Sequence, residues 1–193
     1  QMGKELKPSE MNPNDLPEER AFQDEFTREF LQSVEETRPG YYPFLSKTGK
    51  YKMDFPGDAV IGKQGYTLKK SNFETLVGGI EGKTLAGFTL FYYAENNLEN
   101  IDLHLNWFQG RIGKELEFEV FENDDLRMYY KQFRRSNFDK NVFYVQNLQN
   151  SGGIEIIFTV DCATINDCKK SESDDIQQEF LNWIKSIQFI NEK

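Results

Sequence analysis

The sequence has 193 residues, of which 28% are charged and 15% are aromatic, and its formal net charge is -9. The aromatic content excludes a wholly disordered chain, and no apolar run approaches the roughly 20 residues that span a bilayer. The negative charge argues against general binding to nucleic acids. One His and two Cys leave too few ligands for a typical zinc site, so we expect neither a metal nor a cofactor.

In residues 1–15, polar and proline residues outnumber apolar ones. This composition favours a flexible tether over a packed element. A tether ahead of a globular domain is typical of bacterial lipoproteins, in which it follows the lipid-carrying cysteine. The sequence starts at Gln1 rather than Met, and we expect residues 1–15 to connect a lipid anchor to one α+β domain over residues 16–193; an ordinary disordered tail is the alternative.

Between Leu16 and Arg38, apolar residues recur at the spacing of one helix face. They are Phe22, Phe26, Phe30, Leu31 and Val34. Acidic residues crowd the early turns, where they suit the helix dipole, and Pro39-Gly40 follows as a stop signal. The pattern predicts a helix over 16–38.

After Tyr41, alternating apolar and polar residues replace the helical pattern and predict short strands. The predicted strands are 51–55, 67–70, 73–77 and 85–94, the last of them an aromatic run typical of a central strand. Gly78-Gly79 and Gly152-Gly153 lack the Lys-Ser/Thr of a phosphate loop, so we interpret both pairs as turns.

Three segments follow whose type is harder to read. Residues 101–107 alternate apolar and polar side chains, which favours a strand, although a short helix also fits. Residues 115–120 alternate as well, and a helix starting at the same point is the competing prediction. An aspartate N-cap followed by apolar residues on one face predicts a helix over 124–135.

A β-hairpin and a terminal helix complete the predicted elements. Residues 142–149 and 154–161 flank the turn sequence 150–153 and predict the hairpin. Residues 173–187 predict the helix, because their apolar members recur at helical spacing. These members are Ile176, Phe180, Trp183, Ile184 and Ile187.

Cys162 and Cys168 are the two cysteines, and residues 163–167 separate them. This spacing fits neither a CxxC redox motif nor the usual zinc pairs. A reversing loop can bring the two Cα atoms within about 4.4–6.8 Å, the distance that a disulfide requires. We therefore predict a disulfide, which implies an oxidising compartment; two separate thiols are the alternative.

The predicted strands are joined by short turns rather than by repeated helical crossovers. This order predicts an α+β fold in which a mainly antiparallel β-sheet is flanked by helices, an α-β-α sandwich.

Two stretches resemble the PsbP/Mog1-like superfamily. Tyr51-Lys52-Met53-Asp54-Phe55-Pro56-Gly57 is similar to that family's first strand, and Ser186-Ile187-Gln188-Phe189 is similar to its closing segment after a hydrophobic helix. With the tether, the chain resembles the PsbP-like lipoproteins of Gram-positive bacteria. The resemblance covers roughly residues 51–190 and implies an antiparallel sheet between helices and a role in binding partners. It implies no shared catalytic residues.

Two groups of residues were considered for chemistry. In the predicted strand His104 shares a face with Asp102 and Asn106, an arrangement that can orient a general base. No nucleophile is linked to it by a motif, so we interpret this face as solvated and expect no catalytic residues. Glu122 with its acidic neighbours 124–125 lacks the spacing of a calcium loop, and charge at a helix N-terminus explains the group better.

Basic and aromatic residues interleave in one segment, which makes them candidates for contact with an anionic partner, polymer phosphate or lipid headgroups. They are Tyr129, Tyr130, Lys131, Arg134 and Arg135. A solvated face is the interpretation we favour for this segment. The 17 Phe residues also raise the idea of a pocket for a small hydrophobic ligand, although strand and helix positions already place most of them in a core.

The sequence thus predicts a non-enzymatic, extracytoplasmic binding or assembly module. An N-terminal lipid would hold it on the outer face of the cell membrane (a secreted form is also compatible), and it would act through a protein partner rather than nucleic acid. The alternatives are a cytosolic Mog1-like adaptor, which would need two reduced thiols, and a binder of a small hydrophobic ligand.

Overall fold

Two antiparallel sheets form the centre of the fold. The computed structural model describes residues 3–82, 85–162, 168 and 170–192. The large sheet has eight strands, seven in the order β3-β5-β6-β10-β9-β8-β7 and β4 paired with β5. Its strands are β3 (Ala59–Ile61), β4 (Thr67–Lys69), β5 (Phe73–Glu81), β6 (Leu85–Tyr93), β7 (Glu119–Glu122), β8 (Leu126–Arg135), β9 (Phe138–Asn147) and β10 (Gly153–Asp161). The small sheet has the order β1-β2-β11, with β1 (Tyr41–Leu45), β2 (Tyr51–Pro56) and β11 (Gln188–Phe189).

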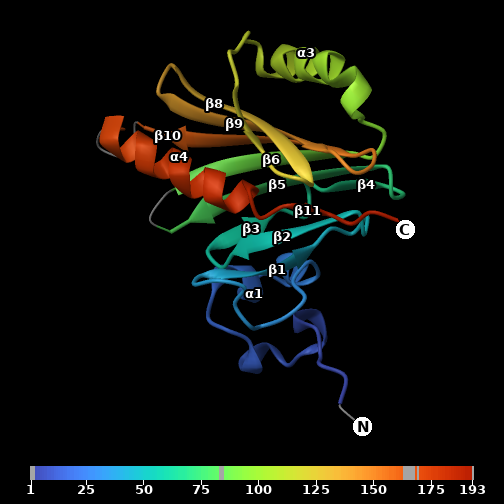
Figure 1. Cartoon of the computed structure of the whole chain (residues 1–193). Helices are drawn as coiled ribbons and strands as arrows, with labels where there is room; N and C mark the ends of the chain where they lie inside the picture. Colours follow the sequence, from blue (N-terminus) through green and yellow to red (C-terminus); the bar gives the residue numbers. More distant parts are fainter. Residues whose placement is uncertain (1–2, 83–84, 163–167, 169, 193) are drawn as a thin grey trace.

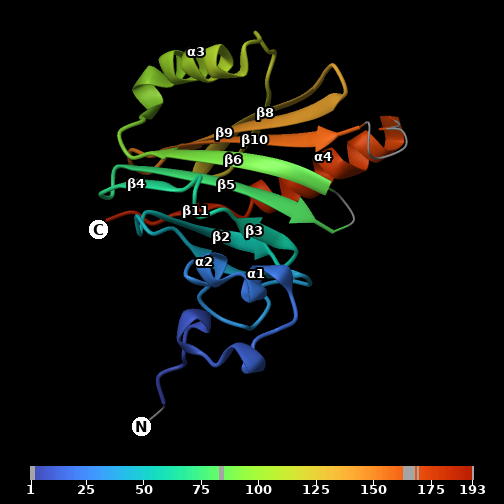
Figure 2. The same cartoon turned by 180° about the vertical axis from the view of Figure 1, so that it is seen from behind.

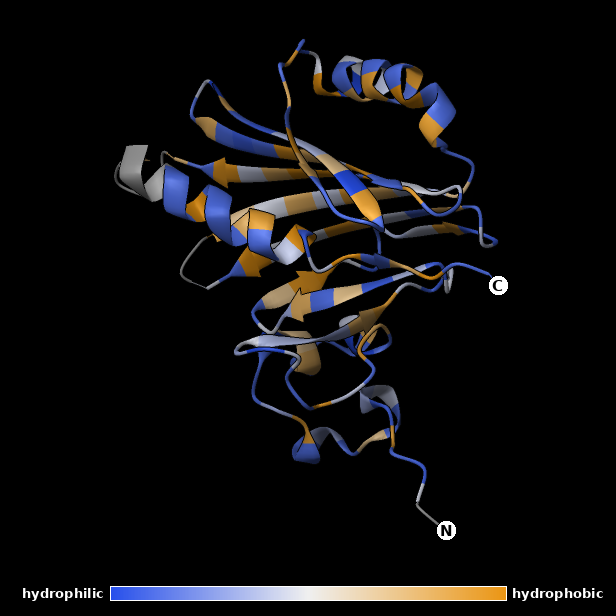
Figure 3. Cartoon of the chain, in the orientation of Figure 1, coloured by the Kyte–Doolittle hydropathy of each residue, from blue (hydrophilic) through white to orange (hydrophobic). Residues whose placement is uncertain are grey.

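The two faces of the large sheet are covered differently. Helix α4 (Lys170–Ile184) and the small sheet lie against one face, which we call the inner face, and α3 (Ile101–Ile112) lies over the opposite, outer face (Figure 1 and Figure 2). Apolar and polar residues alternate along both helices (Figure 3). The predicted α+β fold, an antiparallel sheet between helices, is confirmed.

Trp183 of α4 joins the layers on the inner face. Its indole contacts the rings of Phe55 in the small sheet and of Phe88 and Phe158 in the large sheet, with centroid distances of 5.9, 5.5 and 5.3 Å. Phe158 also stacks on Phe180 of α4 at 4.0 Å. The predicted terminal helix is therefore confirmed, as is the hairpin of β9 and β10 before it. Among the described residues, no helix is long and apolar enough to cross a membrane.

The predicted helix over 16–38 is wrong in its extent. Two one-turn helices form instead, α1 (Arg20–Gln23) and α2 (Glu25–Arg28), separated by Asp24 in an extended conformation. The Asp24 carboxylate caps α2 by accepting bonds from the Thr27 amide (2.9 Å) and hydroxyl (2.6 Å). Further on, the Leu45 amide donates to the Phe30 carbonyl, so this part of the chain pairs with the small sheet. Tertiary hydrogen bonds override the helical spacing here.

Residues 101–107 form the first part of helix α3 rather than a strand. His104, Phe108 and Ile112 are buried at a spacing of four, which is the period of a helix face. Upstream, the short 3-10 helix η3 (Leu98–Asn100) is capped by the Asn97 side chain, and Gly113 ends α3 in the left-handed conformation, at φ 76°. Of the alternating apolar residues, Ile101 and Leu105 pack on the sheet while Leu103 and Trp107 stay exposed, so the alternation did not mark one buried strand face and the strand prediction is wrong.

Most of residues 124–135, predicted as a helix, form strand β8, which starts at Leu126. The side chain of Asn123 accepts bonds from the amides of Asp125 and Leu126, so it shapes a turn rather than starting a helix. At the far end, Arg135 pairs with Phe138 across a two-residue turn that includes Ser136 at φ 54°. The prediction assumed that residues three and four positions apart share one face, as they do in a helix. In a strand, residues three positions apart lie on opposite faces.

Two glycine pairs were predicted to be turns, and one of them is not. Gly78 and Gly79 lie inside β5. A Cβ on Gly78 would lie 2.3 Å from the Val60 carbonyl oxygen and 2.5 Å from the Phe88 ring, so close packing requires a glycine there. Gly152 does lie in the turn before β10, at φ 134°.

Residues 3–15 of the expected tether contain two short 3-10 helices, η1 (Pro8–Glu10) and η2 (Pro13–Asp15). Pro8 is buried, and Met11 packs against the core. Part of this segment therefore contributes to the packed structure, while its role as a flexible connection to an anchor stays a prediction.

Glu74 of β5 lies fully buried on the inner face, between the large sheet and the small sheet. Its carboxylate accepts hydrogen bonds from the hydroxyls of Tyr51 (2.6 Å), Tyr66 (2.6 Å) and Ser46 (2.8 Å) and from the Lys47 amide (3.2 Å). Burial, reinforced by this carboxylate, raises the pKa of Tyr51 and Tyr66, so both phenols remain donors. One side chain thus joins the two sheets.

Each Glu74 carboxylate oxygen accepts two of these bonds, so Gln in its place puts an amide NH2 donor against two other donors. We expect Glu74→Gln to lower the free energy of unfolding by about 2–4 kcal/mol, measured by urea denaturation. The matched control is Glu81→Gln, whose carboxylate pairs with Arg20 on the surface and is worth under about 1 kcal/mol. Equal effects of the two substitutions would contradict this role of Glu74.

Candidate functional site

Helix α3 covers only part of the outer face of the large sheet. Its apolar side packs on β8, β9 and β10, where Phe108 and Ile112 form a second core with Val142 and Tyr144. No residue of β5 or β6 belongs to this second core. Figure 2 shows these two strands uncovered by a helix on this side.

The uncovered part, which we call the open sheet face, carries aromatic and small residues. It is formed by Phe73, Thr75, Val77 and Gly79 of β5 and by Gly87, Thr89, Phe91 and Tyr93 of β6. Phe73 and Phe91 flank Tyr93, with ring centroids 5.4 and 6.4 Å from it. Gly79 and Gly87 are paired in register, and the missing side chains leave a shallow groove of about 530 Å³ beside Val77.

Arg111 of α3 and Glu155 of β10 fix the border between the helix and the open sheet face. The guanidinium donates two hydrogen bonds, of 2.9 and 2.6 Å, to the Glu155 carboxylate, whose side chain is almost fully buried. The guanidinium also lies 5.7 Å from the rings of both Phe91 and Tyr93. Burial raises the pKa of Glu155, and the hydrogen bonds from Arg111 oppose that rise. Because the two bonds join α3 to β10, the pair holds the helix on the sheet.

Trp107 and Leu103 are the exposed apolar side chains of α3, with 58% and 44% of their surface accessible. Because they lie four residues apart, they share one stripe of the helix. Arg111 lies four residues beyond Trp107, so the same side of the helix adjoins the open sheet face. The Trp107 ring touches the His104 ring, with centroids 6.1 Å apart, but most of its surface stays exposed, which makes this stripe a candidate contact surface.

His104 does not form the Asp–His pair considered from the sequence. It lies on the buried side of α3 and stacks on Tyr144, whereas Asp102 is exposed. Its Nε2 accepts a bond from the Asn97 amide (3.2 Å), and its buried Nδ1 has no hydrogen-bond partner. Burial lowers the pKa of His104. The imidazole is therefore a neutral structural group rather than part of a solvated face.

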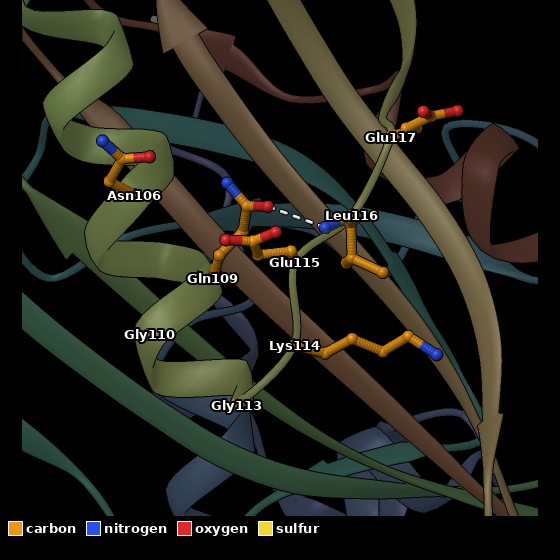
Figure 4. A pocket seen from close by; sticks show the side chains of 8 residues that line it. All are labelled: Asn106, Gln109, Gly110, Gly113, Lys114, Glu115, Leu116 and Glu117. Carbon is orange, nitrogen blue, oxygen red and sulfur yellow. Dashed lines mark hydrogen bonds between the residues drawn. The ribbon is translucent and has the colours of Figure 1, made fainter.

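A polar pocket of about 810 Å³ lies beside α3 (Figure 4). Its wall on the helix includes Asn106 and Gln109, and its other wall is the chain 113–117. The Gln109 side-chain oxygen accepts a bond from the Leu116 amide (2.7 Å) and so holds this chain against the helix. Lys114 and Glu115 point in different directions in Figure 4, with Glu115 beside Gln109 and Lys114 turned away from the helix.

The five basic and aromatic candidates on β8 do not form one site, because alternate residues of a strand face opposite sides. Tyr130 stacks on Phe143 on the inner face, and Arg134 binds Asp139 (2.8 Å) and the Cys168 carbonyl (3.0 Å). The other three lie on the outer face, where Tyr129 packs against α3, Arg135 donates to the carbonyls at the end of that helix, and Lys131 lies between them in the strand.

Cys162 and Cys168 form the predicted disulfide, with 5.3 Å between their Cα atoms. It connects the end of β10 to the start of α4. A loop of this size contributes about 2 kcal/mol. The two sulfurs and the Asp139 carboxylate lie within 4.8 Å of one another, and they are the one group of possible metal ligands found in the described part of the chain. Bonded sulfurs are not thiolates, so this group does not offer a metal site.

The acidic residues Glu122, Asp124 and Asp125 lie at a strand turn rather than at a helix N-terminus. Glu122 ends β7 and pairs with Arg127 at 2.7 Å. Asp124 and Asp125 are exposed in the turn to β8. The explanation by helix charge is therefore wrong, since a strand follows.

The sequence analysis missed every residue of the open sheet face. Phe91 and Tyr93 were placed in a predicted central strand, but the side of the sheet that they face was not predicted. Arg111 and Trp107 had no predicted role. A usable signal was Glu155, a carboxylate in an apolar strand, because a charge at such a position needs a partner from another element.

Comparison with known proteins gives the family. The profile of the family described as "Putative lipoprotein YvcA" matches residues 17–188. The chain belongs to this family. It is 28% identical over 202 residues to the "Putative lipoprotein YvcA" of Bacillus subtilis (strain 168), covering 97% of this chain and 84% of that protein. The family is also named for Mog1, so the predicted PsbP/Mog1-like resemblance is confirmed.

A crystal structure from Bacteroides thetaiotaomicron VPI-5482 is also similar, with a TM-score of 0.42 and 11% sequence identity. The alignment covers 78% of this chain and 48% of the other, so the chain spans about half the length of that protein.

The lowered pKa of His104 has a consequence for stability. The folded protein favours the neutral ring. The stability that this preference gives is therefore fully present above pH 6.5, the ordinary pKa of histidine, and is lost as the pH falls below that value. We expect unfolding free energy to decrease between pH 7 and 5.5 and the decrease to be smaller in His104→Gln. An NMR titration of this one imidazole with a pKa at or above 6.5 would contradict the burial argument.

Proposed function

We propose that the protein is an extracytoplasmic, membrane-anchored module that binds a protein partner through the open sheet face and catalyses no reaction. Membership in a family described as lipoproteins supports the anchored, extracytoplasmic location. The disulfide supports the same compartment and favours it over the cytosolic adaptor, which would need reduced thiols.

The observation that carries the proposal is the incomplete cover of the large sheet. Half-exposed aromatic rings of β5 and β6 lie next to Arg111 of α3, the helix that also carries the exposed Trp107. Tryptophan, tyrosine and arginine are the residues that most often dominate binding energy at protein interfaces. A half-exposed aromatic surface next to a salt-bridged arginine fits a protein partner better than it fits a small substrate, which needs an enclosed pocket.

The position of the N-terminus supports the proposed orientation. Figure 1 places the N-terminal segment and α3 at opposite ends of the molecule. With a lipid anchor on the N-terminal side, Trp107 and the adjoining sheet would face away from the membrane, where a partner can reach them.

The groups at this surface favour binding over catalysis. Glu155 and Arg111 form a salt bridge with each other. His104 is buried on the side of α3 that faces the sheet. General acid–base catalysis needs a titratable group within reach of a substrate, and these groups serve to position the helix instead.

Photo-crosslinking in the native host tests this function. A photoreactive residue replaces Thr89 on the open sheet face and, in a matched control, the exposed Lys52 of the small sheet. We expect position 89 to give a discrete protein adduct that position 52 does not give, and Trp107→Ala to weaken binding to the identified partner about tenfold or more.

Leu6→Ala removes a comparably exposed apolar side chain from the N-terminal segment, which lies at the end of the molecule opposite α3 (Figure 1), and should leave the binding unchanged. Equal adducts from both positions, or none from position 89, would reject the open sheet face as the partner site.

A further inference from the structure

Four cations gather around Phe133 on the outer face, at the C-terminal end of α3. This basic cluster consists of Lys114, which follows α3, Lys131 and Arg135 of β8, and Lys140 of β9. Lys131, Phe133 and Arg135 share the outer face because they alternate along the strand. Lys140 pairs in register with Phe133. The cluster lies on a chain whose net charge is -9.

The geometry fixes three of the four positive groups. The Lys114 ammonium and the Arg135 guanidinium lie 5.0 and 5.9 Å from the centroid of the Phe133 ring. Arg135 donates to the Ile112 and Gly113 carbonyls at 3.0 Å each, so the end of the helix holds its side chain. The Lys140 ammonium donates to the Thr159 hydroxyl at 2.8 Å, which leaves it further N–H donors.

The like charges of the cluster are close together. None of the salt bridges among the described residues involves one of these four cations. Burial, with the nearby charge of Arg135, lowers the pKa of Lys140. Proximity of like charges costs free energy that a bound anion would recover. Figure 4 shows Lys114 turned away from α3, whereas Glu115 lies beside Gln109.

We propose that the basic cluster binds a phosphate-bearing polyanion, as a second site beyond the proposed partner surface. Four cations spread over a helix end and two strands match several charges along a flexible chain better than they match one small anion. Lysine ammonium groups bind phosphate oxygens as point charges, and the Phe133 ring gives the site an apolar floor.

The position of the cluster favours a polymer over the membrane surface. It lies at the α3 end of the molecule, and the N-terminal segment lies at the other end (Figure 1). A chain anchored on its N-terminal side would hold this cluster away from its own membrane.

The test measures binding of inorganic polyphosphate to the full chain at about 50 to 200 mM salt, by fluorescence anisotropy of labelled polymer. We expect affinity to fall steeply with salt. Lys114→Gln with Lys131→Gln should weaken binding about tenfold or more and lower the slope of log affinity against log salt by roughly 1 to 2. Arg135 and Lys140 are left intact because their side chains also hold backbone or strand neighbours.

The matched control is Lys52→Gln with Lys63→Gln, two exposed lysines elsewhere on the surface. Each double variant removes two positive charges, so 21 basic against 32 acidic residues gives a net charge of -11 in both. An equal loss in both would mean that total charge, not the cluster, decides binding. Should the double variant fold poorly, Lys114→Gln alone, at an exposed position, carries the comparison with Lys52→Gln.

Two further arms identify the source of the phosphate. Orthophosphate should compete only weakly, and vesicles of phosphatidylcholine with phosphatidylglycerol should not bind. Vesicle binding that depends on Lys114 and Lys131, without polyphosphate binding, would replace the polymer by a lipid surface and overturn the proposal. Absence of polyphosphate binding at the lowest salt would overturn it as well.

Discussion

The four hydrogen bonds to the buried Glu74 carboxylate are the constraint on which the arrangement of the two sheets depends. Tyr51 and Ser46 approach it from the small sheet and its turn, and Tyr66 from the segment before β4. An ionised carboxylate is costly to bury unless donors satisfy it, so the small sheet has little freedom to move against the large one. Trp183 then fills the space that the two sheets leave under α4.

The inner face of the large sheet is thus covered by α4 and the small sheet, whereas its outer face is covered only in part. One helix covers its β8–β10 half, and the Arg111–Glu155 pair sets where that cover stops. Aromatic residues line the uncovered half, and basic residues lie at the end of the helix. The two proposed sites therefore share one scaffold and differ in chemistry, one apolar and aromatic, the other cationic.

Local sequence signals were sufficient where they agreed with the tertiary contacts. The β9–β10 hairpin, the terminal helix and the disulfide each follow from spacing over a few residues. The signals were misleading where one pattern fits two periods. Residues 101–107 alternate as a strand would but form a helix, and the apolar positions of 124–135 have helical spacing but lie mostly in a strand. Between residues 16 and 38, a cap at Asp24 and pairing with the small sheet broke a helix that the spacing favoured.

The candidate sites were harder to predict, because each depends on which residues the sheet brings together. On β8 the sequence offered five neighbours, but strand alternation sends Arg134 to Asp139 and Tyr130 to the core, and it groups Lys131 and Arg135 with Lys114 and Lys140 instead. Register and the path of α3 decide this grouping, and no local pattern encodes them.

Labelling with a membrane-impermeant maleimide tests the central claim most directly, that an extracytoplasmic partner occupies the open sheet face. Thr89→Cys on that face and Lys52→Cys on the small sheet are each labelled in intact host cells and as purified protein; the native cysteines are bonded to each other. The account predicts labelling of both positions in purified protein, and in intact cells labelling at position 52 with protection at position 89. Equal labelling of both positions in cells, or labelling only after lysis, would contradict it.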